Sequence, residues 1–148
     1  LGMSRGLGDV YKRQTKKKLN PGVWDVSVAG HIGYKEDIKA AAIRETFEET
    51  GIHIKENDLL KLGIYTSESN HSKIIDREFH HTYILKIDEV KINLNYKNDE
   101  VDDLKLISLR EMDLQLNQNN RDIFIGKNKN YYKDVFEAIL KITRENYQ

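Results

Sequence analysis

Residues 30–52 constrain the fold of this chain more than any other part of the sequence. Gly30 and Gly33 bracket a loop, and residues 37–50 are rich in helix formers. Gly51 stands where a glycine commonly ends a helix, because glycine adopts the left-handed backbone conformation at little steric cost. The sequence therefore predicts a loop, a helix and a second loop in direct succession.

The predicted helix carries three glutamates on one face. Glu45, Glu48 and Glu49 stand at positions i, i+3 and i+4, so their carboxylates are neighbours. At ~5 Å and an effective dielectric of ~20, each pair of charges repels by roughly 3 kcal/mol before screening. A cation removes this cost, and oxygen ligands without thiolates select Mg²⁺, Mn²⁺ or Ca²⁺ over zinc or copper. The spacing thus indicates a platform for a divalent cation and phosphate groups.

The whole segment resembles the Nudix box, Gly-x5-Glu-x7-Arg-Glu-U-x-Glu-Glu-x-Gly-U, in which U is an aliphatic residue. The residues that match are Gly30, Glu36, Arg44, Glu45, Glu48, Glu49, Gly51 and, at the last U, Ile52. Thr46 at the first U is a mild departure. Two adjacent glutamates alone are typical of a solvated helix face, whereas this many fixed residues at fixed offsets indicate one family.

The resemblance implies a catalytic role for four of these residues. Glu48 and Glu49 match the metal-ligand pair of Nudix enzymes, and Glu45 matches either a third ligand or a base that polarises water. Arg44 would orient the carboxylates through a bidentate contact. In the implied reaction, the metal neutralises the phosphates and lowers the pKa of a water that attacks one phosphorus.

The resemblance also assigns residues outside the helix. Gly30 and Glu36 belong to the loop that binds the cofactor, and the Gly30 carbonyl is a candidate further ligand. Glu100, before a strand predicted at residues 102–108, is either a second candidate base or an exposed loop carboxylate.

The residues before the box narrow the resemblance to one branch of the family. Residues 21–31, Pro-Gly-Val-Trp-Asp-Val-Ser-Val-Ala-Gly-His, look like the branch similar to isopentenyl-diphosphate isomerase. In that isomerase a catalytic Cys precedes the Gly-His pair, but this chain has Ala29 there and no Cys anywhere. The isomerase reading is therefore disfavoured. His31 either keeps the metal-ligand role of the isomerase His or is a loop His bonded to backbone.

The order of the predicted elements indicates an α/β domain. Helices are expected at residues 37–50, 109–114 and 131–146, and strands at residues 23–28, 62–67, 79–88 and 102–108. They mix without a repeat, which is typical of helices packed on a sheet. The resemblance makes this a Nudix-type α/β/α sandwich with a mixed sheet.

The predicted strands carry three aromatic residues with two possible roles and two adjacent His residues. Trp24, Phe79 and Tyr83 belong to the core or stack on a substrate base. His80 and His81 are adjacent on one strand, so they should face opposite sides of the sheet.

The first residues of the chain look foreign. Residues 9–14, Asp-Val-Tyr-Lys-Arg-Gln, are what the frame GAT-GTG-TAT-AAG-AGA-CAG encodes, and that string resembles a transposon end used as a sequencing adapter. We therefore expect residues 1–14 to be non-native and residues 15–148 to be a Nudix domain lacking its N-terminal strands. The alternative is a disordered natural tail. Missing strands would open the sheet edge, so we expect poor folding or inactivity.

Composition limits the partners and the compartment. Lys plus Arg equals Asp plus Glu at 24 each, which gives no general electrostatic reason to expect nucleic acid or an anionic membrane as a partner. The chain lacks Cys, which agrees with a cytoplasmic protein.

The sequence as a whole predicts a hydrolase that uses Mg²⁺, or Mn²⁺ in its place, and cleaves a diphosphate linkage in a small phosphorylated metabolite. The sequence does not specify the group attached to the diphosphate. The substrate could be a nucleoside diphosphate derivative, a dinucleotide cofactor or an isoprenoid diphosphate. A homodimer is a further expectation. The alternatives are an isomerase-like enzyme and a Nudix-fold module that binds a ligand without turnover.

Overall fold

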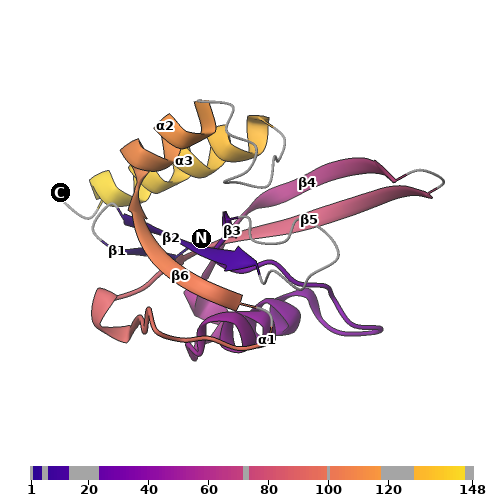
Figure 1. The fold of residues 1–148 in the computed structure, drawn as a ribbon, viewed down its shortest axis with the longest axis horizontal. Coiled ribbons are helices and arrows are strands. Elements are labelled where there is room, and N and C mark those ends of the chain that lie inside the picture. Colours follow the sequence, from indigo (N-terminus) through magenta and orange to yellow (C-terminus); the bar gives the residue numbers. More distant parts are fainter. Residues whose placement is uncertain are drawn as a thin grey trace.

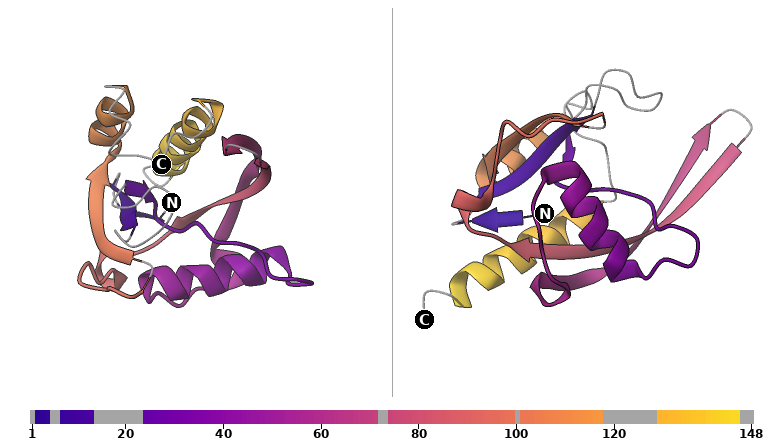
Figure 2. Two further views of the ribbon diagram at one scale, coloured as in Figure 1. Left: turned by 45° about the vertical axis from the view of Figure 1, so that its right-hand side comes forward. Right: turned by 90° about the horizontal axis from the view of Figure 1, so that it is seen from below.

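The protein is described by a computed structural model in which a sheet lies between helices. The residues that it describes are 2–4, 7–13, 24–71, 74–99, 101–117 and 129–145. Helix α1 (Ile38–Thr50) covers one face of the sheet, and helices α2 (Leu109–Asn117) and α3 (Lys129–Glu145) lie on the other face (Figures 1 and 2). This arrangement confirms the predicted α/β sandwich.

Six strands form one sheet in the described part of the chain. They are β1 (Gly2–Ser4), β2 (Leu7–Arg13), β3 (Trp24–Val26), β4 (Leu59–His71), β5 (Ile74–Lys86) and β6 (Val101–Ser108). Their order is β3-β2-β1-β5-β4, and β6 also pairs with β2. Strand β1 is parallel to β5 while the other pairs are antiparallel, so the sheet is mixed, as expected.

The segment that we expected to lie outside the fold contributes the first two strands. Strand β2 pairs with β3 through Val10 and Val26, and with β6 from Leu7 opposite Ser108 onward. A β-branched and an aromatic residue, Val10 and Tyr11, suit a strand, and β3 and β6 each offer an edge that needs a partner. The described chain therefore has strands before Trp24, where we expected none. The non-native origin of residues 1–14 stays a prediction.

Strands β4 and β5 form a hairpin longer than the sequence indicates. Polar residues such as Glu68 give no strand signal, yet pairing continues outward from Glu68 opposite Arg77 to Asn70 opposite Ile75. Backbone pairing between β4 and β5 thus extends both strands beyond the residues with an apolar pattern. The hairpin projects beyond the helical layers (Figure 1).

The main core lies between the sheet and helix α3. Its buried members are Val26, Ile84, Ile107, Met112, Tyr131, Tyr132, Val135 and Ile139. The helix predicted at residues 131–146 is confirmed as α3, and its residues supply half of this cluster. Two short 3-10 helices, Glu56–Asp58 and Glu89–Lys91, flank the hairpin.

Within the described residues, no helix has the length and apolar character needed to cross a bilayer. Pro21 and Gly22, which begin the segment that resembles the isomerase branch, and the candidate base Glu100 lie outside the described residues.

Candidate active site

Local hydrogen bonds fix both ends of α1. The Asp37 carboxylate accepts from the backbone amides of Lys39 at 2.9 Å and Ala40 at 3.1 Å, which satisfies two donors of the first turn. At the other end Gly51 has φ 72°, and its amide donates to the Phe47 carbonyl at 2.8 Å. The helix predicted from the box therefore begins and ends where its capping residues stand.

Arg44 is the centre of the polar contacts on α1. Its Nε and Nη2 donate to the two oxygens of Glu36, at 2.8 and 2.9 Å, in a bidentate pair. Its Nη1 donates to Glu45 at 2.7 Å and to Glu48 at 2.9 Å, and Nη2 also donates to the His31 carbonyl at 3.0 Å. One guanidinium thus ties the helix to the preceding loop.

The Glu36–Arg44 pair is ionised at neutral pH. The Arg44 guanidinium, and then the Gly33 amide at 2.7 Å, lower the pKa of Glu36 from 4.5 to about 2. Hydrogen bonds to Glu36 and Glu45 in turn raise the pKa of Arg44 above its usual value. Glu36 therefore acts as a permanent anion that holds the loop closed on the helix.

The three glutamates of the helix have different surroundings. Glu49 is buried, with 3% exposure, and its Oε2 accepts from the Ala29 amide at 3.0 Å. Glu45 lies so close to Gly30 that a Cβ on Gly30 would overlap the Glu45 carboxylate, which would then have to move. The Glu48 side chain is the most open, at 54% exposure.

The carboxylates do not converge on one point. Within the described parts of the chain, no three His, Asp or Glu side chains are placed together to hold a metal ion. Glu45 and Glu48 turn toward Arg44, while Glu49 turns toward Ala29. In chemistry the donor set fits a hard divalent cation, since it offers carboxylate oxygens on one helix face beside a close-lying loop. The assignment of metal ligands stays a prediction.

A cluster of polar side chains on the hairpin lies beside the loop. His31, with 96% side-chain exposure, places Nε2 3.9 Å from Glu78. His80 Nε2 lies 2.7 Å from Ser67 Oγ and 3.4 Å from Glu78. Glu78 and Ser67 were not predicted as site residues, because their proximity to the box depends on the path of the hairpin and not on residue spacing.

The predicted strand aromatics separate into two kinds. Trp24 packs against the core and lies under the Lys105 ammonium, 4.5 Å from the ring centroid. Phe79 is 72% exposed, so the core interpretation is wrong for this residue. The two neighbouring His residues pair with different positions of β4, His80 with Tyr65 and His81 with Ile64.

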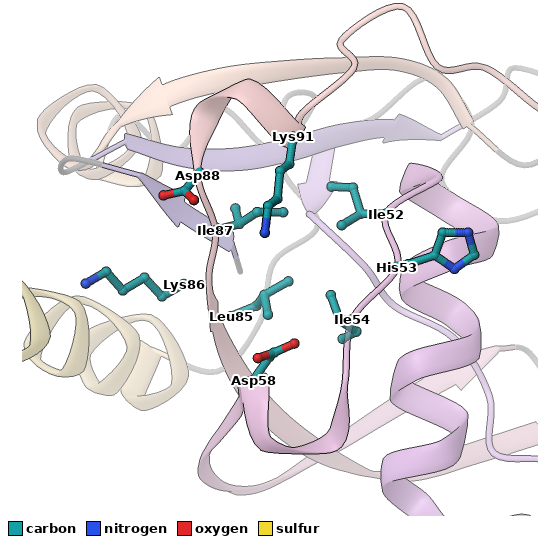
Figure 3. Close-up of a pocket in the computed structure, with 9 residues that line it drawn as sticks. All are labelled: Ile52, His53, Ile54, Asp58, Leu85, Lys86, Ile87, Asp88 and Lys91. Carbon is teal, nitrogen blue, oxygen red and sulfur yellow. The ribbon is translucent and has the colours of Figure 1, made fainter.

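A pocket of about 200 Å³ lies beyond the end of α1. Its lining residues are Ile52, His53, Ile54, Asp58, Leu85, Lys86, Ile87, Asp88 and Lys91 (Figure 3). The Lys91 ammonium points into it, whereas Lys86 points away (Figure 3). None of the box carboxylates lines this pocket, so we do not assign it to the chemistry of α1.

Comparison with known proteins decides the family. The family model described as the NUDIX domain matches residues 10–125, which is more than half of the chain. The chain belongs to the Nudix hydrolases. Members of this family generally use divalent metal ions and act on small phosphorylated substrates. The match confirms the family inferred from the box.

Individual relatives agree with this assignment. An uncharacterized Nudix hydrolase of Clostridium acetobutylicum is 32% identical over 153 residues, which span 87% of this chain and 74% of that protein. Nudix hydrolase 3 of Arabidopsis thaliana is 34% identical over 77 residues, 51% of this chain but only 10% of that protein. A MutT NUDIX hydrolase structure from Burkholderia pseudomallei gives a TM-score of 0.60 at 18% identity, covering 74% of this chain and 78% of that one. At that identity the last comparison shows the fold alone.

Proposed function

We propose that this Nudix hydrolase uses Mg²⁺, or Mn²⁺ in its place, to cleave a diphosphate linkage in a nucleoside diphosphate derivative or a related small metabolite. The observation that supports the proposal is the set of carboxylates on α1 and their contacts. Its three glutamates share one helix face, and Arg44 ties that face to the loop, where Gly30 lies close to the Glu45 carboxylate. Carboxylate oxygens on one helix face, beside a close-lying loop, are the donors that a hard divalent cation and its accompanying phosphates would need.

Glu45, Glu48 and Glu49 would hold the cation, with the Gly30 carbonyl as a further oxygen donor. A bound divalent cation neutralises phosphate charge and acidifies water for attack on phosphorus. Glu48 is the carboxylate most open to an incoming diphosphate, whereas the buried Glu49 is oriented by the Ala29 amide. Glu45, partly buried beside Gly30, is a ligand or accepts the proton of the attacking water.

Arg44 and Glu36 act by orientation in this mechanism. The bidentate pair uses both oxygens of Glu36 and leaves Arg44 Nη1 for Glu45 and Glu48. Arg44 thus restricts the rotamers of Glu45 and Glu48, the two predicted metal ligands, before the cation or the substrate binds. Such preorganisation lowers the cost of assembling the charged site.

Two other readings have less support. The likeness of residues 21–31 to isopentenyl-diphosphate isomerase suggests a related branch, but Ala29 stands where the isomerase has its catalytic Cys. A module that only binds a ligand would not need the full set of carboxylates. Dinucleotide cofactors and isoprenoid diphosphates stay alternatives for the substrate. A homodimer, a cytoplasmic location and the absence of a nucleic-acid partner stay predictions.

A substrate panel tests the proposal. The chain is incubated with Mg²⁺ and nucleoside diphosphate sugars, dinucleotide cofactors or isopentenyl diphosphate, and the products are scored as monophosphate, phosphate or isomer. We expect monophosphate from one class and no product when EDTA removes the metal. An isomerised product without hydrolysis would favour the isomerase, and a folded protein that binds a substrate without turnover would favour the module.

A further inference from the structure

The C-terminal turn of α1 receives hydrogen bonds from a segment far along the chain. The last carbonyls of a helix have no partner within it. The Ile52 amide, the next donor after Gly51, bonds instead to Thr50 Oγ1 at 3.3 Å. The Glu48 carbonyl accepts from the Tyr96 hydroxyl at 3.0 Å and from the Asn98 side-chain amide. Two side chains of one loop therefore meet at the peptide group that links Glu48 to Glu49.

Tyr96 and Asn98 are themselves fixed. The Asn98 side-chain oxygen accepts from the Val101 backbone amide at 2.9 Å, and the Asn98 backbone amide donates to the Val101 carbonyl at 3.3 Å. Val101 is buried, and the Tyr96 ring packs against the cluster that it forms with Leu104. The Tyr96 ring also lies so close to Gly51 that a Cβ there would be 2.8 Å from the ring. The loop thus connects the end of α1 to strand β6.

We infer that Tyr96 and Asn98 are positioning residues for the metal ligands Glu48 and Glu49, an inference that rests on the proposed function. The contacts that Arg44 and Glu49 make with the preceding loop involve their side chains, whereas Tyr96 and Asn98 hold a backbone carbonyl of the last turn. Hydrogen bonds to the Glu48 carbonyl restrain the peptide between the two ligands. This restraint fixes the backbone positions from which the Glu48 and Glu49 side chains extend. Residues that orient metal ligands in this way tune metal affinity in proteins.

Mn²⁺ binding by the metal alone tests the inference. The variants are Tyr96→Phe, which keeps the ring on Gly51 and removes only the hydroxyl, Asn98→Ala, and the double variant. Asn93→Ala is the matched control, since its side chain bonds the Asn95 amide at 3.1 Å within the same loop. Electron paramagnetic resonance of free Mn²⁺ gives Kd for each protein. We expect Kd to rise about tenfold in the double variant, less in each single variant, and within about twofold in the control.

The dependence of activity on Mg²⁺ concentration distinguishes a positioning role from a purely structural one. The double variant should need about tenfold more Mg²⁺ for half-maximal rate, while kcat at saturating Mg²⁺ and KM for substrate stay near those of the parent protein. A folded double variant with the parent's Mn²⁺ Kd and Mg²⁺ requirement would overturn the inference. A parent protein that binds no Mn²⁺ would overturn the proposed function and this inference together. If the double variant fails to fold, Tyr96→Phe decides by the same two measurements.

Discussion

Helices α1 and α3 lie on opposite faces of one sheet and are held there by different forces (Figure 2). The buried residues of α1 are Ala41, Thr46, Glu49 and Thr50, so three of the four are polar. The buried residues of α3 within the core are Tyr131, Tyr132, Val135 and Ile139. Directional hydrogen bonds and ion pairs orient the first helix, and apolar burial holds the second.

This difference between the helices indicates that α1 mainly sets the geometry of the site, whereas α3 mainly stabilises the fold. Burial of apolar surface is non-directional and contributes most of the free energy of folding. A hydrogen bond contributes only about 1 kcal/mol net but fixes a side chain in one orientation. We therefore expect substitutions in α1 to change activity more than stability, and substitutions in α3 to do the reverse.

The largest expected effect comes from Glu49→Gln. A neutral amide can still accept the hydrogen bond from Ala29, so the melting temperature should change little. Loss of a ligand charge should lower kcat about a thousandfold, or about 4 kcal/mol in activation free energy. Steady-state kinetics and thermal melting on the same preparation measure both. Retained turnover would mean that the ligand assignment is wrong.

The opposite result is expected for Ile139→Ala in α3. Ile139 is fully buried, and truncating it should lower the free energy of unfolding by about 3 kcal/mol. Its neighbour Leu140 is 46% exposed, so Leu140→Ala is the matched control with a clearly smaller loss. Urea denaturation measures both variants. If Ile139→Ala, while still folded, lost kcat as strongly as Glu49→Gln, the division between the two helices would not hold.

Gly51→Ala sharpens the comparison at the end of α1. Its φ of 72° disfavours any residue with a Cβ, and that Cβ would meet the Tyr96 ring at 2.8 Å. We expect a loss of about 2 kcal/mol in the free energy of unfolding. Gly63→Ala is the control, because its Cβ would find its nearest contact at 3.4 Å, on the Tyr65 ring. Equal losses in the two variants would argue against a special conformation at Gly51.

The sequence predicted α1 well because its determinants are local. Asp37 and Gly51 cap the helix within four residues of its ends, and the observed helix, Ile38–Thr50, nearly matches the expected range. The fold class could be predicted for a similar reason, since the apolar periodicity of α3 is visible in the chain. The box, in turn, identified the family that the comparisons show.

Contacts between distant residues were not predictable in the same way. Arg44 was expected to orient the carboxylates through a bidentate contact. It contacts Glu45 and Glu48 through single hydrogen bonds, but its bidentate partner is Glu36 of the preceding loop, which was not expected. Tyr96 and Asn98 reach Glu48 across about fifty positions, and no spacing rule connects them. Such contacts depend on how loops cross the sheet, which hydrophobic patterns leave undetermined.

The smallest effect concerns the Glu36–Arg44 pair and appears only in acid. The pKa of Glu36 is about 2 in the folded protein, below its ordinary 4.5, so the folded state favours the charged carboxylate. The pair's contribution to stability is then fully present above pH 4.5 and is lost as pH falls toward 2. Glu36→Gln lacks this titration, and other carboxylates cancel when the two proteins are compared at each pH. Urea denaturation should therefore show a stability gap that is constant near neutral pH and closes in acid. A gap that stayed constant down to pH 2 would mean that Arg44 holds Glu36 by shape rather than by charge.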